Sequence, residues 1–304
     1  MALSVPLGAV LVSIVIHSLW GGNPVAVKFS LLAFPPLTTA FLRFAIGIAC
    51  IALWAHWRGI SLRPERGEWR AMWIVALLFA VQIASMNIGF DHTSGAMGSV
   101  LIATNPLFAV IFAHFLVAGD RLTPMKGLGL TVAMAGTLLA MLEDADIASL
   151  DFGAAGNWIV LSSALMLGFR LALGARFVRR IEPTKVALWQ MVLSLPLFGV
   201  GALWLEEIAW DAVGVGPIAG LLFQGIVIAG VGFTVSYHLM KRYTPSVMMS
   251  FNFISPIAGV LFATWLLGDR VGPLLLAGMA LVAVGLYLKR SNTHRLAASF
   301  GTIF

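Results

Sequence analysis

The sequence predicts an all-α polytopic membrane protein whose ten transmembrane helices form two inverted five-helix repeats. Two observations lead to this fold class. The chain of 304 residues is 60% hydrophobic and only 11% charged, whereas ordinary soluble domains are about 25% charged. Its two halves also share a pattern of motifs, and many membrane transporters are built from such internal repeats.

The repeat is visible in short motifs that recur about half a chain apart. Asn105-Pro106 and Gly119-Asp120-Arg121 in the first half correspond to Ser255-Pro256 and Gly268-Asp269-Arg270 in the second. The offset is 150 at the prolines and 149 from the Gly-Asp-Arg triplet onward. Four later glycines keep the offset of 149: Gly129, Gly136, Gly278 and Gly285. We therefore expect repeats over 1–148 and 149–291, followed by a cytoplasmic tail over 292–304.

Apolar segments long enough to cross a hydrocarbon core of about 30 Å recur along the chain. They lie near residues 6–32, 36–57, 70–90, 94–117, 123–142, 154–178, 183–205, 215–240, 245–267 and 273–290. Prolines begin several of these helices, where the missing N–H costs nothing. The first segment has no basic leader and no small-residue cleavage pattern, so we expect a retained helix and not a signal peptide.

Charge predicts the orientation, because Lys and Arg favour cytoplasmic loops. If the amino terminus is cytoplasmic, most of the 19 Lys and Arg residues fall on the cytoplasmic side. Five spans per repeat is an odd number, so the second repeat enters the membrane from the opposite side. Asp120-Arg121 then lies inside and Asp269-Arg270 outside, with both termini in the cytoplasm. Such an inverted pair is suited to alternating access.

Several motifs carry a family resemblance. Trp20-Gly21-Gly22-Asn23, followed by Lys28, resembles the opening motif of the EamA-type members of the drug/metabolite transporter superfamily. Leu42-Arg43-Phe44 and the Gly-Asp-Arg end of the fourth span are also similar to that family. The resemblance covers the whole chain and implies ten helices in two five-helix repeats. Asp120 and Asp269 stand where glutamate is common. Within the family the pattern most resembles the YddG-type exporters of aromatic and other amino acids.

The sequence offers little reactive chemistry. No Asp or Glu lies deep in a predicted span, which argues against carboxylate dyads, metal–carboxylate sites and acidic proton relays. Cys50 is the single cysteine, so there is no disulfide framework or metal-ligand spacing. We therefore expect no enzyme activity, no metal and no cofactor. His17 is the one histidine well inside a span, as a proton carrier or, more commonly, as a hydrogen-bonded packing residue.

Polar side chains within spans are costly in lipid and should face the bundle interior or a watery cavity. His17, Trp20 and Pro24 share one face of the first span, with Asn23 beside them. The Gly21–Pro24 run, which weakens or kinks that helix, serves either substrate binding or a hinge with close helix packing. The third span adds Gln82 and Ser85. The serines have a simpler explanation, because a hydroxyl often bonds back to its own helix.

Two further groups complete the predicted site. The fourth and ninth spans are interrupted by proline at matching places, which points to Asn105, Asn252 and Ser255 at a central site. Arg43 and Arg170 are the intramembrane cations, and either guanidinium suits a substrate carboxylate; for Arg43 a structural bond to backbone carbonyls is the alternative. Trp158 and Tyr237 are candidates for stacking, although the interfacial belt is the default for tryptophans near span ends. The predicted substrate-binding residues are His17, Trp20, Asn23, Arg43, Gln82, Ser85, Asn105, Trp158, Arg170, Tyr237, Asn252 and Ser255.

The sequence thus predicts a secondary transporter that exports small metabolites, with aromatic and other neutral amino acids favoured, across the bacterial inner membrane by alternating access through a central cavity. Its expected partners are a small-molecule substrate and membrane lipid. Nucleic acid is not expected, because the basic residues form no patch, and a monomer is the working oligomeric state. The alternatives are a drug or sugar exporter of the same superfamily, or a non-transporting membrane protein such as a pore.

Overall fold

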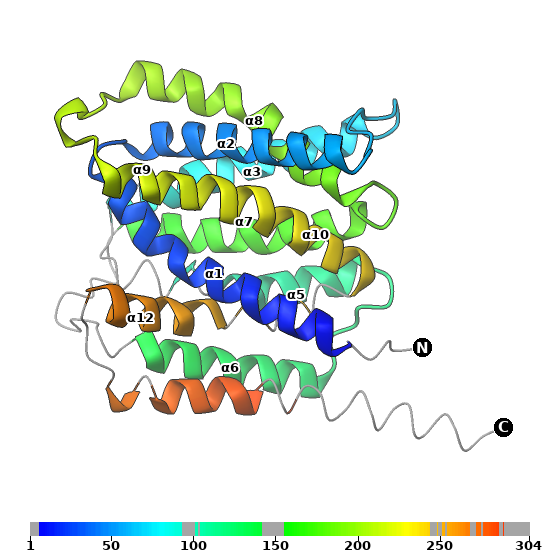
Figure 1. Cartoon of the computed structure of the whole chain (residues 1–304). Helices are drawn as coiled ribbons and strands as arrows, with labels where there is room; N and C mark the ends of the chain where they lie inside the picture. The colour runs from blue at the N-terminus through cyan, green and yellow to red at the C-terminus, as the bar shows by residue number, and fades with distance from the viewer. Residues whose placement is uncertain are drawn as a thin grey trace.

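The computed structural model describes residues 6–92, 101–102, 104–141, 155–243, 248, 251–252, 254–267, 272–274, 276–285 and 288. Within these residues the chain is helical and contains no strand (Figure 1). The elements are α1 Leu7–Leu31, α2 Pro36–Trp57, α3 Trp69–Asp91, α5 Asn105–Leu116, α6 Pro124–Met141, α7 Ala155–Phe177, α8 Pro183–Leu205, the short helix η2 Trp210–Ala212, α9 Val215–Leu222, the π-helix η3 Phe223–Gly232, α10 Phe233–Arg242 and α12 Ile254–Leu267. A further helix spans Leu276–Gly285.

Six helices of the described chain are long and apolar enough to cross a membrane, which confirms an all-helical membrane fold. They are α1, α2, α7, α8, the Trp69–Met86 part of α3, and the continuous helix Val215–Arg242. The other expected spans coincide with α6, α5, α12 and Leu276–Gly285, but parts of the expected segments 94–117, 245–267 and 273–290 lie outside the described residues. The total of ten spans therefore stays a prediction.

The helices pack mainly with partners from the other half of the chain. α1 lies against α12 and α9, while α7 lies against α3 and α5. α2 packs against α8 and η3 at the edge of the bundle shown at the top of Figure 1. The aromatic core between α2, α3 and α8 contains Phe44, whose ring centroid lies 4.8 Å from that of Phe79 and 5.6 Å from that of Phe198.

The repeated glycines form a close contact between α6 and the helix Leu276–Gly285. A Cβ atom at Gly136 would lie 2.6 Å from the carbonyl oxygen of Gly278, and one at Gly285 would lie 2.6 Å from that of Gly129. Shifting every residue by 149 positions exchanges these two contacts, which is the relation that a two-fold axis imposes. At these glycines the backbones of α6 and of the helix Leu276–Gly285 are in contact, which leaves no room for a side chain.

A second pair of close contacts joins corresponding helices of the two halves, although no single offset relates all four residues. A Cβ at Gly21 of α1 would lie 2.7 Å from the nitrogen of Gly259 in α12, and one at Gly168 of α7 would lie 2.6 Å from the nitrogen of Ala109 in α5. Gly259 follows Ala109 by 150 positions, the offset of the repeated prolines. Gly21 therefore allows close packing of α1 on α12. α1 continues as one helix through residues 21–24.

The helix that begins at Val215 departs from regular α geometry. Ten of its residues, Phe223–Gly232, form the π-helix η3, whereas α3 of the first half is α-helical throughout Trp69–Asp91. π-helical turns are rare and occur often at functional sites. No pattern in the sequence predicted this π-helix.

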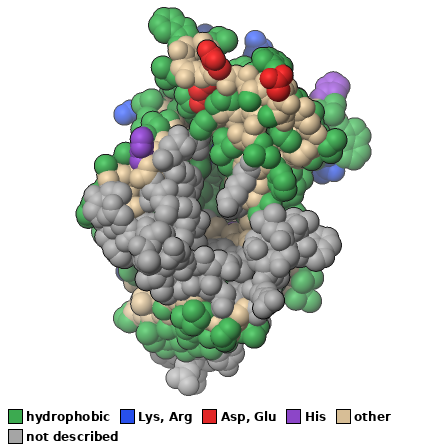
Figure 2. Space-filling model, turned by 90° about the vertical axis from the view of Figure 1, so that its left-hand side faces the viewer, with side chains coloured by type: hydrophobic (Ala, Val, Ile, Leu, Met, Phe, Trp, Pro, Cys, Tyr) green, Lys and Arg blue, Asp and Glu red, His purple; other side chains and the backbone are tan. Residues whose placement is uncertain are grey.

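The two ends of the bundle differ in charge. The end where α8 finishes and α9 begins, called here the acidic end, carries Glu206, Glu207 and Asp211. The opposite, basic end carries Arg58, Arg63, Arg66, Arg70, Arg176, Arg179, Arg180, Lys241 and Arg242. Figure 2 views the acidic end, where a hollow lies near the centre of the face.

The turn after α5 contains the first Gly-Asp-Arg motif. Gly119 has a φ of 83°, a left-handed conformation that favours glycine. The carboxylate of Asp120, which is buried, lies 2.9 Å from Lys126 Nζ at the start of α6. This glycine and aspartate therefore shape the α5–α6 turn. The second motif, at 268–270, lies outside the described residues.

Candidate functional site

The most connected polar cluster inside the bundle, called here the Arg170 cluster, joins α7, α8 and α10. Arg170 donates from Nη1 to Oε1 of Gln190 over 3.0 Å, and the hydroxyl of Tyr237 donates to the same oxygen over 2.9 Å. The guanidinium carbon also lies 4.9 Å from the ring centroid of Phe79 on α3. These four residues are all buried, with Arg170 only 2% exposed. Three helices are thus tied together near the basic end.

Two polar atoms of the Arg170 cluster are buried without a hydrogen-bond partner: Arg170 Nε and Gln190 Nε2. Buried polar groups normally have partners, so such exceptions call for an explanation. The aspartates and glutamates of the described chain lie at helix ends or in the segments between helices. Within the described residues, no carboxylate therefore lies along the middle of a helix, where it could balance the charge of the Arg170 guanidinium.

A second polar cluster, called here the Arg43 cluster, joins α2, η3 and α1 near the acidic end. Arg43 Nη1 donates to Gln224 Oε1 over 3.3 Å. Gln224 Nε2 in turn donates to Ser30 Oγ over 2.8 Å and to the carbonyl oxygen of Ala26 over 3.3 Å. Here the amide nitrogen is fully used, although Arg43 Nε has no partner. The structural alternative for Arg43 was a bond to backbone carbonyls, whereas its partner in the structure is a side-chain amide.

The two clusters occupy matching places. Arg43 lies seven residues after Pro36, the first residue of α2, and Gln190 lies seven residues after Pro183, the first residue of α8. Each cluster pairs a guanidinium with a glutamine amide and an aromatic ring. Gln190 and Gln224 were missed by the sequence reasoning, although the position of Gln190 relative to Pro183 was a usable signal.

The segments at the starts of the proline-containing helices α5 and α12 are joined by a hydrogen bond. Asn252 Nδ2 donates to Oδ1 of Asn105 over 3.1 Å, and Asn105 Nδ2 donates to the carbonyl oxygen of Ile102 over 2.8 Å. Ser255 Oγ donates to the carbonyl oxygen of His17 over 2.7 Å. The structure therefore brings together the starts of α5 and α12 and the middle of α1.

His17 has the contacts of a packing residue. Its Nδ1 lies 2.7 Å from the carbonyl oxygen of Ser13, one turn earlier in α1, so this nitrogen carries the proton. The ring is buried and lies 6.2 Å from that of Phe251.

Trp20 and Asn23 lie further along α1. The ring of Trp20 lies 5.2 Å from that of Phe233, beside the end of η3. Asn23 Oδ1 is buried without a hydrogen-bond partner. An acceptor free to receive a donor therefore remains on α1, on the part of the helix nearer the acidic end.

Gln82 lies in the seam between α3 and α7. Its Nε2 donates to Ser163 Oγ over 3.2 Å, and Ser163 Oγ donates to the carbonyl oxygen of Gln82 over 3.0 Å. Gln82 Oε1 is buried without a partner. Ser85 is partly buried one turn further along α3. Ser163 was not anticipated from the sequence.

Trp158 stands apart from all of these groups. It is 65% exposed near the start of α7, which fits the interfacial belt that is the default for such tryptophans. The described residues also contain no group of three His, Cys, Asp or Glu side chains that could hold a metal ion.

Comparison with known proteins gives the family. The profile of the EamA-like transporter family matches twice, over residues 7–142 and 154–290. The chain belongs to the EamA-like transporter family. It is therefore a multi-pass membrane transporter, and the resemblance noted in its motifs is confirmed at the level of the EamA-type superfamily.

Individual relatives of this EamA-like chain are distant but span its length. The chain is 26% identical to the uncharacterized transporter YvbV of Bacillus subtilis, over 92% of this chain and 91% of the relative. It is 23% identical to the uncharacterized inner membrane transporter YedA of Escherichia coli strain K12, over 90% of each.

A plant relative and a solved structure complete the comparison. A WAT1-related chloroplastic protein of Arabidopsis thaliana is 25% identical over 88% of this chain, which spans 66% of that protein's length. A crystal structure with 22% identity has a TM-score of 0.82 and covers 95% of this chain and 98% of its own. That likeness concerns the fold alone.

Proposed function

We propose that this EamA-like protein is a secondary transporter that exports small metabolites, with aromatic and other neutral amino acids as the favoured cargo, by alternating access across a bacterial inner membrane. The observation that carries the proposal is the set of polar side chains buried between helices of an otherwise apolar bundle. Such residues are expensive in lipid and mark substrate pathways.

The proposed orientation places the basic end in the cytoplasm, because Lys and Arg favour that side. Both termini are then cytoplasmic, and the hollow faces outward. The two halves act as inverted repeats divided near residue 148, and the two-fold contacts of the repeated glycines support this division. The relative YedA is named as an inner membrane transporter, which supports the same location here.

Amino acid cargo is supported by the chemistry of the buried groups. Arg170 and Gln190 present donors suited to a carboxylate, while Asn23 Oδ1 and Gln82 Oε1 are free acceptors suited to an ammonium group. The rings of Trp20, Phe79 and Phe233 provide apolar surface. The likeness of the motifs to YddG-type exporters points to the same cargo. A monomer with surrounding lipid suffices for this mechanism, which requires no cofactor.

Counterflow in liposomes tests the proposal. Purified protein is reconstituted with L-phenylalanine inside, and entry of radiolabelled L-phenylalanine is followed. A carrier gives saturable entry that internal substrate accelerates, because loaded binding sites return faster than empty ones. Entry that rises linearly with concentration and ignores the internal amino acid would instead indicate a pore. Sugars and cationic drugs, tested as competitors, address the alternative cargoes.

A further inference from the structure

We propose that Arg170 and Gln190 together form the subsite that binds the carboxylate of the transported solute, a proposal that rests on the proposed function. It narrows the cargo to small carboxylates with an apolar or aromatic body. The argument uses the charge of the cluster, its free hydrogen-bond donors, and its difference from the Arg43 cluster.

Among the residues that the structure describes, no carboxylate lies along the helix interior to balance the charge of Arg170. A guanidinium stays protonated in proteins, and this one is 2% exposed. The acids of the described chain lie at helix ends or between helices. The ring of Phe79, 4.9 Å away, offsets part of the desolvation, about 0.5–2 kcal/mol for such contacts. An ionised group buried without a counter-ion marks a functional site in a membrane protein, and a solute carboxylate supplies the missing charge.

Two hydrogen-bond donors of the cluster are free, and both are of a kind that can bind a carboxylate. Gln190 Oε1 accepts from both Arg170 and Tyr237, which fixes the amide orientation because arginine can only donate. The amide nitrogen is therefore left as a donor, and it has no partner. Arg170 Nε is a second donor without a partner in the same cluster. Paired N–H donors with a positive charge favour bidentate binding of a carboxylate.

The Arg43 cluster also leaves its arginine Nε without a partner, but its glutamine amide is fully bonded. Gln224 spends its amide nitrogen on Ser30 and Ala26 of α1, so no amide donor remains for a ligand. Arg43 there holds α2 to η3 and, through Gln224, to α1. Gln190, which lies on α8 at the position that matches Arg43 on α2, keeps its amide nitrogen unused. The difference between two otherwise similar clusters assigns the ligand to the Arg170 side.

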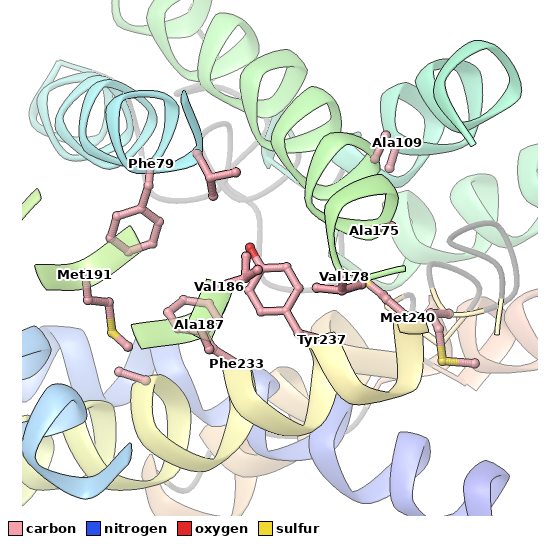
Figure 3. Close-up of a cluster of buried hydrophobic side chains, with 14 of the residues drawn as sticks. Phe79, Ala109, Ala175, Val178, Val186, Ala187, Met191, Phe233, Tyr237 and Met240 are labelled. Atoms are coloured by element: carbon pink, nitrogen blue, oxygen red, sulfur yellow. The ribbon is translucent and has the colours of Figure 1, made fainter. Parts of the chain in front are cut away.

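The surroundings of the subsite suit an apolar solute and a gated entry. Figure 3 shows Phe79, Phe233, Tyr237 and Met191 pointing into the same space from α3, α10 and α8. The Phe79 and Phe233 ring centroids are 5.9 Å apart. Since Arg170 and Gln190 are buried in this conformation, the subsite fills only after these rings move. Tyr237 donates a hydrogen bond to Gln190 and would therefore lie beside the bound carboxylate.

Thermal protection of the detergent-solubilised full-length protein tests the subsite separately from transport. Four related probes are compared: L-phenylalanine, 3-phenylpropionate, L-phenylalaninol and phenethylamine. The first two carry a carboxylate and the last two do not. We expect half-maximal protection by the carboxylates at concentrations at least about 10-fold lower, the range expected for a hydrogen-bonded charge contact. The same titrations are made with Arg170→Gln, Arg170→Lys, Arg43→Gln and Arg180→Gln, the last being an exposed arginine at the basic end.

The proposal predicts that Arg170→Gln loses the preference for carboxylates, that Arg170→Lys keeps part of it, and that Arg43→Gln and Arg180→Gln retain it. Equal protection of the wild-type protein by all four probes, or by none, overturns the subsite even if no variant folds. If Arg170→Gln still prefers the carboxylate probes, the proposed subsite is also overturned. Carboxylate protection without L-phenylalanine counterflow would refute amino acid export while leaving the subsite standing. Counterflow of L-phenylalaninol as fast as that of L-phenylalanine would refute the carboxylate subsite while leaving amino acid export standing.

Discussion

Alanine at Gly136 should weaken the contact between α6 and the helix Leu276–Gly285. The added Cβ would lie 2.6 Å from the carbonyl oxygen of Gly278, 2.7 Å from Leu281 Cβ and 2.9 Å from the nitrogen of Val282. Favourable non-bonded contacts lie at about 3.5–4.0 Å. Backbone atoms surround the new methyl group, so no flexible side chain can move aside. The two helices must separate by roughly 1 Å.

The magnitude follows from two opposing effects. Replacing glycine by alanine within a helix stabilises it by about 1 kcal/mol, whereas overpacking costs about 1–3 kcal/mol. Gly127 lies on the same helix with nothing within 4 Å of its would-be Cβ, so Gly127→Ala should show the first effect alone. The difference between the two variants therefore isolates the overpacking, and corresponds to about 2–12 °C in Tm.

The assay is thermal unfolding of each purified variant in the same detergent, followed by tryptophan fluorescence. Gly127→Ala should unfold at or above the wild-type temperature and Gly136→Ala below it. Because Gly285 makes the two-fold related contact with Gly129, Gly285→Ala should lose a similar amount. Equal Tm values for Gly127→Ala and Gly136→Ala would refute the close helix contact.

Three other predictions follow from single contacts. Glu206→Ala should lower Tm by about 2–8 °C, because the carboxylate accepts hydrogen bonds from the backbone nitrogens of Leu37 and Thr38 at 2.7 Å each and so caps α2. The control is Glu207→Ala at the exposed neighbouring position, and equal losses of Tm in the two variants would contradict the cap. Lys185→Glu should destabilise the basic end, since Lys185 Nζ lies 3.0 Å from Glu68 with both side chains largely buried. Adding Glu68→Lys should restore Tm, and a double variant that stays at the lower Tm would show that this ion pair does not stabilise the protein. Asn23→Ala and Gln82→Ala should each reduce L-phenylalanine counterflow about 10- to 150-fold with normal membrane insertion, as expected for loss of one hydrogen bond to a charged group. Unchanged kinetics would exclude these residues from the pathway.

The helices were predictable because their signals are local. Proline at the first helical position and a polar residue after the last one gave the bounds Pro36–Trp57 and Pro183–Leu205 as the structure has them. Arg170 was identified by its charge within a span and Tyr237 by its aromatic ring, and the structure places both in one buried cluster. Composition and motif order predicted the membrane fold and the family.

Partners and local geometry were not predictable, because they depend on packing between distant segments. A glutamine within an apolar run does not show which helix it will meet, so Gln190 and Gln224 escaped notice. The π-helix at Phe223–Gly232 has no sequence signature of its own. Trp158 was included for its aromatic ring, but only the packed bundle shows that it lies on an exposed face.

Sided labelling of the two Gly-Asp-Arg corners tests the account most directly. Single cysteines are introduced as Arg121→Cys and Arg270→Cys in a Cys50→Ala background, and intact cells are treated with a membrane-impermeant maleimide before and after permeabilisation. The account predicts that position 270 reacts in intact cells and that position 121 reacts only after permeabilisation. Labelling of both corners from the same side would contradict two halves of opposite orientation, and with them the proposed alternating access.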